Sequence, residues 1–144
     1  MNETREPSLA PCRADRLLIV DDEPMIRKVF HRTFVTEFPG VTIDQAANGA
    51  EAVDLFKSGR HAVVLMDLAM PIMDGEKAYQ AIQRLCQEQK WALPSVVFCT
   101  GFSPSPSVRD IVAANPKHCM LKKPVKNQLL VDTIRSRLPP PPAG

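Results

Sequence analysis

Polar side chains capable of catalytic chemistry follow the short apolar runs of this chain, at the point where each run ends. Two carboxylates, Asp21 and Asp22, follow the first run, and a third, Asp67, follows a later one. Thr100 and Lys123 come after two further runs. Three acids that meet in one crevice would repel one another unless a cation lay among them, and Mg²⁺ prefers such oxygen ligands. These residue types therefore predict a magnesium site.

A lysine and a hydroxyl beside a bound cation are what is needed to hold a phosphoryl group. The two positive groups neutralise the phosphoryl oxygens, and a threonine hydroxyl donates a hydrogen bond to one of them. A carboxylate can then act as the nucleophile and form an acyl phosphate. Each residue alone has a plainer interpretation, as a helix-capping acid, a turn residue, a structural threonine or a solvated lysine. The order acid, acid, hydroxyl, lysine after successive runs favours the chemical interpretation.

Five apolar runs are bounded by turn-forming residues and are too short for buried helices, so each predicts a β-strand. The runs are continuously apolar, which is typical of strands buried on both sides. The segments between them alternate with the runs, and this alternation predicts a parallel sheet with helices on both faces. Ligands of such sheets bind beyond the carboxyl ends of the strands. The predicted strands are Leu17–Val20, Val41–Ile43, Ala62–Met66, Val96–Cys99 and His118–Leu121.

The segments between the runs show the apolar spacing of amphipathic helices, and we predict five. Pro24 suits a first helical position, Asp74 and Gly75 a helix entry, and Pro39 and Gly40 a helix stop. The predicted buried positions are Ile26, Val29, Phe30, Thr33 and Phe34; Gly49, Ala52, Val53 and Phe56; Ala78, Ala81, Ile82, Leu85 and Cys86; Val108, Ile111 and Val112; and Leu130, Ile134 and Leu138.

Composition indicates one domain with one core of ordinary size, since 44% of the 144 residues are hydrophobic and 24% are charged. A net charge of +2 excludes a disordered chain and a strongly basic nucleic-acid binder. No apolar run approaches the ~20 residues that span a membrane, and the polar N-terminus does not resemble a secretory signal. Four irregularly spaced cysteines indicate reduced thiols in a cytoplasmic protein. We expect a domain over 16–138, a flexible tail over 1–15, and a proline-rich tail or linker stub over 139–144.

Four short motifs, taken together and in order, match one known family. They are Leu17–Pro24 (Leu-Leu-Ile-Val-Asp-Asp-Glu-Pro), Asp67–Gly75, Thr100-Gly101 and Lys123-Pro124. On these motifs the chain resembles the receiver domain of two-component response regulators, over nearly all of the expected domain. The resemblance implies a flavodoxin-like, doubly wound α/β fold, with five parallel strands in the order 2-1-3-4-5 and five helices.

The resemblance also implies a role for each acid. Asp67 would be the phosphoacceptor, and its donor would be a phosphohistidine on a sensor histidine kinase or a histidine phosphotransfer protein. Asp22, Asp67 and the main-chain carbonyl of Ala69 would bind Mg²⁺, and Asp21 would hold one of the water ligands of the ion. The chain would then catalyse only its own phosphorylation and dephosphorylation, and it would signal by contact with a downstream protein target.

Two further motifs receive roles by the same resemblance. Thr100, followed by Gly101, would move toward the phosphoryl group after it arrives. Lys123 would contact a phosphoryl oxygen, positioned by a cis bond to Pro124. Lys122 is the weaker candidate, because the active lysine of the family directly precedes the proline.

The chain departs from the family at the position three residues before the active lysine. Receivers usually place Tyr or Phe there, as a rotamer switch coupled to the threonine, whereas this chain has Met120. Methionine has no ring, so any coupling to Thr100 must be a softer packing rearrangement.

A second departure concerns the water that attacks the acyl phosphate. The two positions that flank this water in receivers are Ala69 and Phe102 here. Neither side chain can orient a water molecule by a hydrogen bond, and a phenyl ring there would shield the site. We therefore predict slow autodephosphorylation.

The partner of this receiver is left open by the sequence. Only six residues follow the predicted last helix, so we expect either a stand-alone receiver or one excised from a hybrid histidine kinase. From Lys117 to Arg137 there are six basic residues and one acid, a net charge of +5 that leaves −3 for the rest. This segment is either a solvated helix face or a surface for an acidic partner. Direct binding to nucleic acid is not expected.

Three other functions compete with a phosphorylated receiver. A pseudo-receiver would use the same fold only as an interaction module. A flavodoxin-like FMN protein would need a hydroxyl- and glycine-rich phosphate loop after the first strand, where this chain has carboxylates. An aspartate-based phosphatase of the haloacid-dehalogenase type would need a second acid at the position of Ala69.

Overall fold

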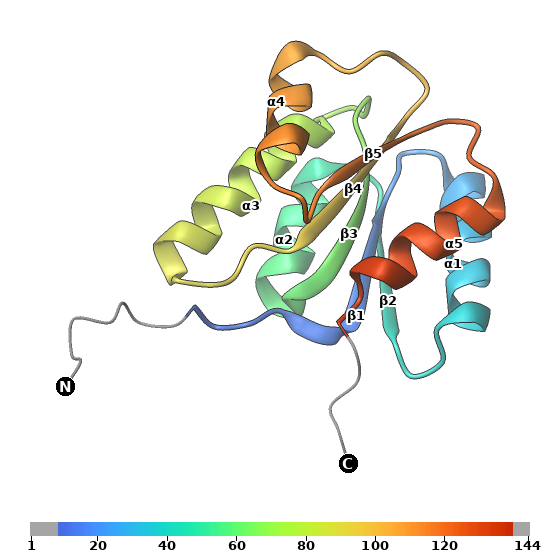
Figure 1. The fold of residues 1–144 in the computed structure, drawn as a ribbon, viewed down its shortest axis with the longest axis horizontal. Coiled ribbons are helices and arrows are strands. Elements are labelled where there is room, and N and C mark those ends of the chain that lie inside the picture. Colours follow the sequence, from blue (N-terminus) through green and yellow to red (C-terminus); the bar gives the residue numbers. More distant parts are fainter. Residues whose placement is uncertain (1–8, 140–144) are drawn as a thin grey trace.

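Five parallel strands form one sheet in the order β2-β1-β3-β4-β5, with five helices packed on its two faces (Figure 1). This computed structural model describes residues 9–139. The arrangement confirms the predicted doubly wound α/β fold. The elements are β1 (Arg13–Val20), α1 (Pro24–Glu37), β2 (Thr42–Ala46), α2 (Gly49–Gly59), β3 (His61–Asp67), α3 (Gly75–Gln89), β4 (Ser95–Thr100), α4 (Pro106–Ala114), β5 (Cys119–Lys122) and α5 (Asn127–Arg137).

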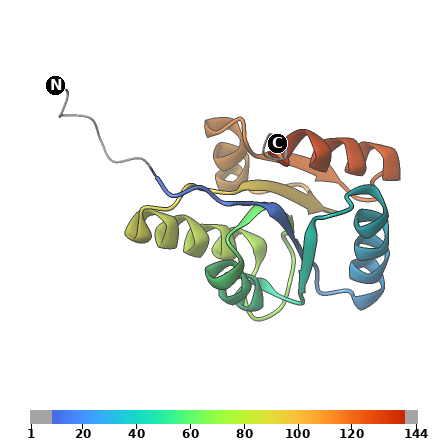
Figure 2. The same cartoon turned by 90° about the horizontal axis from the view of Figure 1, so that it is seen from below.

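The sheet separates α1 and α5 on one face from α2, α3 and α4 on the other (Figure 2), and a hydrophobic core lies under each group. Leu18 and Val20 of β1 pack in the core under α2, α3 and α4, whereas Leu17 and Ile19 pack in the core under α1 and α5. The central strands β3 and β4 are buried along their whole length, as predicted. The prediction of strands buried on both sides is wrong for β2 and β5, because an edge strand has a neighbour on one side only.

The N-terminal boundary of the domain differs from the prediction. β1 begins at Arg13 rather than Leu17, so the expected tail over 1–15 is wrong for Arg13–Asp15. Ala10 also forms a parallel bridge with Trp91. A search for apolar runs misses this part of the strand, because its first three residues are Arg-Ala-Asp. The rest of the two predicted tails, residues 1–8 and 140–144, lies outside the described residues.

Arg60 holds this N-terminal segment against the core. Its guanidinium lies 3.9 Å from the centre of the Trp91 ring. One of its nitrogens also donates to the carbonyl oxygens of Ala10 and Pro11, both at 3.1 Å. A cation–π contact and two hydrogen bonds therefore extend the ordered domain beyond its predicted start.

The predicted helix boundaries agree with the structure. Pro24 is the first residue of α1, and Gly40, with a φ of +88°, follows the end of that helix. Asp74 caps α3 by accepting a hydrogen bond from the backbone of Lys77 at 2.8 Å. None of the helices in the described part of the chain has the length and apolarity needed to cross a membrane.

One predicted core position of α1 is wrong. Val29 is 56% exposed, although Phe34 on the same face is fully buried. Val29 lines an apolar groove of about 450 Å³ between α1 and the segment Lys123–Val125. Within residues 9–139 no element covers this groove, so the apolar stripe of the first half of α1 stays open.

Candidate functional site

Three carboxylates meet at the carboxyl edge of the sheet. Asp21 and Asp22 follow β1, and Asp67 is the last residue of β3, the strand hydrogen-bonded to β1. One oxygen from each carboxylate lies within 4.8 Å of the others. Asp21 is 2% and Asp67 6% exposed, so two of the three charges are buried. This donor set, hard oxygens with surplus negative charge, fits a divalent cation such as Mg²⁺.

Lys123 brings one positive charge to the acids from the loop after β5. Its Nζ lies 2.8 Å from Asp21 Oδ2 and 3.5 Å from Asp67 Oδ2. Its backbone N–H donates to the carbonyl of Thr100 at 2.8 Å, and its bond to Pro124 is cis, as the family resemblance implied. Lys122 is an exposed residue at the end of β5. The structure thus places Lys123, not Lys122, among the acids.

The charges in this cluster shift the pKa of two groups. Burial raises the pKa of Asp67; the ammonium of Lys123 and a hydrogen bond from the backbone of Ala69 oppose this, and the carboxylates of Asp21 and Asp22 add to it. Burial works against the charge of Lys123, but its hydrogen bond to Asp21 and the two nearby carboxylates raise its pKa. Asp67 therefore carries a costly charge that a bound cation would relieve.

We expect Asp67→Asn to stabilise the cation-free protein at neutral pH, because the substitution removes an unfavourable buried charge. The expected gain in the free energy of unfolding is roughly 0.5–2 kcal/mol, the usual range for a stabilising substitution. Since the pKa of Asp67 is raised in the folded state, the folded state binds the proton more tightly than the unfolded state. The Asp67 carboxyl group therefore contributes most favourably to the free energy of unfolding below the ordinary aspartate pKa. This contribution falls as pH rises through the raised pKa of the folded state. The advantage of the variant should vanish in acid. Thermal unfolding from about pH 3.5 to 7.5 measures this.

Addition of Mg²⁺ should make the wild type more stable than Asp67→Asn, because a ligand that binds only the folded state stabilises it. At a Mg²⁺ concentration one hundred times the dissociation constant, this gain is about 2.7 kcal/mol. Asp67→Asn should gain much less than the wild type. Asp54→Asn, at an exposed position of α2, is the control. A wild type that Mg²⁺ does not stabilise would contradict the cation site.

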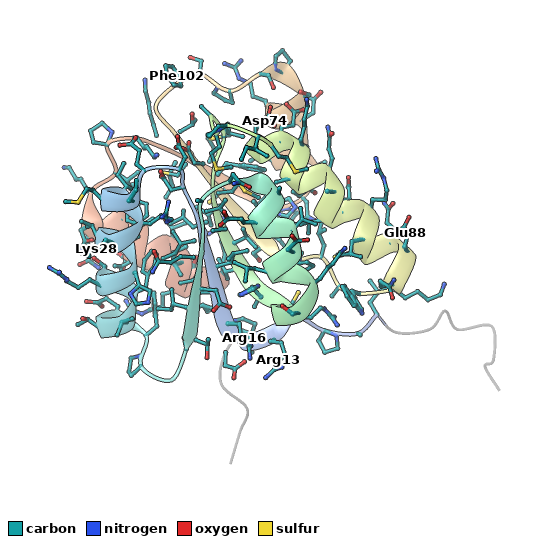
Figure 3. The ribbon with its side chains drawn as sticks, turned by 180° about the vertical axis from the view of Figure 1, so that it is seen from behind. Arg13, Arg16, Lys28, Asp74, Glu88 and Phe102 are labelled. Carbon is teal, nitrogen blue, oxygen red and sulfur yellow. The ribbon has the colours of Figure 1, made fainter. Side chains whose placement is uncertain are left out.

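Thr100 lies at the end of β4, next to β3, but its hydroxyl faces its own loop. The side chain is 2% exposed, and Oγ1 accepts a hydrogen bond from the backbone of Phe102 at 3.2 Å. Phe102 is 72% exposed and lies at the top of the molecule in Figure 3, so most of its ring is in contact with solvent. The expectation that this ring shields the site stays a prediction. Met120 is half-buried against the core under α2–α4.

Two residues of the site were missed by sequence reasoning. Arg27 of α1 donates to the main-chain carbonyl of Asp21 at 2.7 Å, and the Asp21 carboxylate accepts from the backbone of Glu23 at 2.9 Å. These bonds fix the loop that carries Asp22. The second is Gly75, which the sequence placed at a helix entry and at the end of a family motif without a role at Asp67. A Cβ on Gly75 would lie 2.3 Å from the main-chain oxygen of Asp67, so only glycine fits.

We expect Gly75→Ala to destabilise the protein by about 1–3 kcal/mol, because the added methyl group must displace the backbone of Asp67. Gly101→Ala is the matched control, since a Cβ there meets no atom within 4 Å. Thermal or urea unfolding of both variants compares them. Equal free energies of unfolding for the two variants would show that the backbone at Asp67 can move aside with no loss of stability.

The basic segment over 117–137 is smaller as a surface patch than its net charge indicates. Arg135 lies within 3.2 Å of Glu37 and 3.7 Å of Asp132, and Arg137 donates to the carbonyl of Lys117. The ammonium of Lys117 donates to the Leu93 carbonyl, and that of Lys123 lies among the acids. Lys117, Lys122, Lys126 and Arg135 are exposed, and among these four only Arg135 has an acidic partner in the described part of the chain.

Comparison with known proteins gives one consistent family. The model described as the response regulator receiver domain matches residues 17–135. The positive alginate biosynthesis regulatory protein of Pseudomonas aeruginosa is 35% identical over 121 residues, which are 83% of this chain and 45% of that protein. The chain thus spans less than half the length of that relative.

Single-domain relatives match over nearly their full length. The chemotaxis protein CheY of Halobacterium salinarum is 29% identical over 121 residues, 84% of this chain and 94% of that protein. Among solved structures, a chain of the CheX–CheY–BeF3–Mg²⁺ complex from Borrelia burgdorferi superimposes with a TM-score of 0.68 at 26% identity. That match covers 84% of this chain and 87% of the other.

Proposed function

The chain belongs to the response regulator receiver family, and on that premise we propose that it is a phosphorylation-controlled signalling switch with Asp67 as its phosphoacceptor. The Asp67 carboxylate attacks the phosphorus of a phosphohistidine on the donor protein. A carbonyl–oxygen–phosphorus bond forms, the nitrogen–phosphorus bond breaks, and the histidine leaves as neutral imidazole after taking up a proton. The product is an acyl phosphate on Asp67.

The observation that carries this proposal is the meeting of the three acids with Lys123 at one edge of the sheet. An ammonium 3.5 Å from Asp67 Oδ2 is placed to contact an oxygen of a phosphoryl group on that carboxylate. Asp22, Asp67 and the Ala69 carbonyl would hold Mg²⁺, with Asp21 holding one of its waters. The ion supplies positive charge to the phosphoryl oxygens when bound. Thr100 donates to a phosphoryl oxygen once its loop has moved.

The partners follow from this chemistry. The donor in the cell is a sensor histidine kinase or a histidine phosphotransfer protein, the two kinds of protein whose phosphohistidine supplies receivers. The output is a contact with a downstream protein, and the only reactions of the chain are its own phosphorylation and dephosphorylation. We place it in the cytoplasm, where its four free thiols would stay reduced.

Intact-mass measurement after incubation with acetyl phosphate tests the proposal. We expect a gain of about 80 Da, the mass of one phosphoryl group, that requires Mg²⁺. Transfer from a panel of phosphorylated histidine kinases then identifies the donor. A chain that gains no mass and does not bind beryllofluoride with Mg²⁺ would instead act as a pseudo-receiver.

A further inference from the structure

A hollow of about 190 Å³ separates the two loops beside Asp67. One wall is the start of α3 and the loop before it, with Ala69, Asp74 and Glu76. The other wall is the loop between β4 and α4, with Thr100 and the segment Phe102–Ser105. The loop between β4 and α4 therefore has free space on the side that faces the loop before α3. This space lies next to Thr100, the residue expected to move toward a phosphoryl group on Asp67.

Glu76 bridges the outer end of this hollow. Its carboxylate accepts a hydrogen bond from the Ser107 hydroxyl and lies 3.4 Å from that of Ser105, and the two hydroxyls are 3.0 Å apart. Within residues 9–139 Glu76 has no ion pair, so these two serines are its side-chain partners. We call Glu76, Ser105 and Ser107 the glutamate–serine bridge. Hydrogen bonds to a carboxylate are stronger than those between neutral groups.

The bridge holds the same loop that carries Thr100. Ser105 is the N-cap of α4 and accepts from the backbone of Val108 at 3.3 Å. Only four residues separate it from Thr100, whose hydroxyl accepts from the backbone of Phe102. A loop shift of about 1 Å would lengthen the bridging hydrogen bonds beyond the range in which they are strong. The loop position therefore depends on Glu76 at one end and on Thr100 at the other.

We propose that Glu76 is a positioning residue of the switch: through Ser105 and Ser107 it holds the β4–α4 loop in the resting position, in which the Thr100 hydroxyl accepts from the backbone of Phe102. This inference rests on the proposed function. A phosphoryl group on Asp67 draws the Thr100 hydroxyl toward it, and the bridge opens as the loop moves. The bridge thus couples the phosphorylation site to α3 and α4, although position 120 holds a methionine and not an aromatic residue.

Beryllofluoride, a non-covalent mimic of the phosphoryl group, measures the equilibrium between the two loop positions. We expect Glu76→Ala and Ser107→Ala in the full chain each to bind it roughly three- to tenfold more tightly, since each removes a charged hydrogen bond present only at rest. The affinity for Mg²⁺ alone should stay unchanged, because the ion does not need Thr100. The double variant should bind no more tightly than the tighter single variant, because both remove the same contact.

Glu88→Ala, at an exposed position near the end of α3, is the matched control and should bind as the wild type does. Unchanged beryllofluoride affinity in both bridge variants, or fully additive effects, would overturn the role of Glu76 and leave the receiver function intact. A wild type that binds no beryllofluoride would refute the proposed function itself.

Discussion

Asp67→Asn will abolish the Mg²⁺-dependent phosphoryl adduct completely, the largest effect that we expect from any single substitution. Asparagine keeps the size and shape of the side chain, but its amide cannot act as the nucleophile. Because the variant should fold at least as stably as the cation-free wild type, loss of the adduct will report the missing carboxylate and not an unfolded chain. Intact-mass spectrometry after acetyl phosphate treatment is the measurement.

Asp74→Asn provides the matched control for this experiment. Asp74 lies near the site and caps α3, a position that asparagine also fills well. This variant should gain the adduct as the wild type does. An adduct of the same size on Asp67→Asn would show that another group accepts the phosphoryl group, and peptide mapping would locate it. That result would remove the basis of the proposed function.

Ala69→Asn will speed loss of the phosphoryl group by about tenfold, a modest part of what a positioned polar group contributes to proton-transfer chemistry. In the wild type neither Ala69 nor Phe102 can orient the attacking water. Ala69 lines the hollow between the two loops, where an amide side chain has room. Its oxygen or nitrogen would hold a water on line with the phosphorus. The decay of the phosphorylated protein after removal of acetyl phosphate gives the rate.

Ala69→Leu separates orientation from the presence of a larger side chain, because leucine has the same number of side-chain heavy atoms as asparagine, branched at the same carbon, and no hydrogen-bonding group. It should decay no faster than the wild type. If the asparagine variant also decays no faster, the absence of a positioned water is not what makes the wild-type phosphorylated state long-lived.

Local sequence patterns were enough to predict the fold and the order of the site residues along the chain. Apolar runs too short for helices, alternating with segments of helical period, predicted the parallel sheet, because both patterns depend on neighbours a few residues away. The polar residues at the ends of these runs then had to meet at one edge, since parallel strands end on the same side. The family motifs added the strand order, the cis bond before Pro124 and the choice of Lys123 over Lys122.

The contacts that hold the site at rest could not be predicted from local patterns. Lys123 lies closer to Asp21 than to Asp67, Thr100 faces its own loop, and Glu76 reaches two serines. These contacts join residues distant in sequence, so their distances depend on how rigid helices pack on the sheet. The same holds for Val29: it shares the apolar face of α1 with buried Phe34 but is exposed, since no element among residues 9–139 covers its end of the helix. Periodicity specifies which face of a helix is apolar, and packing decides how much of that face is covered.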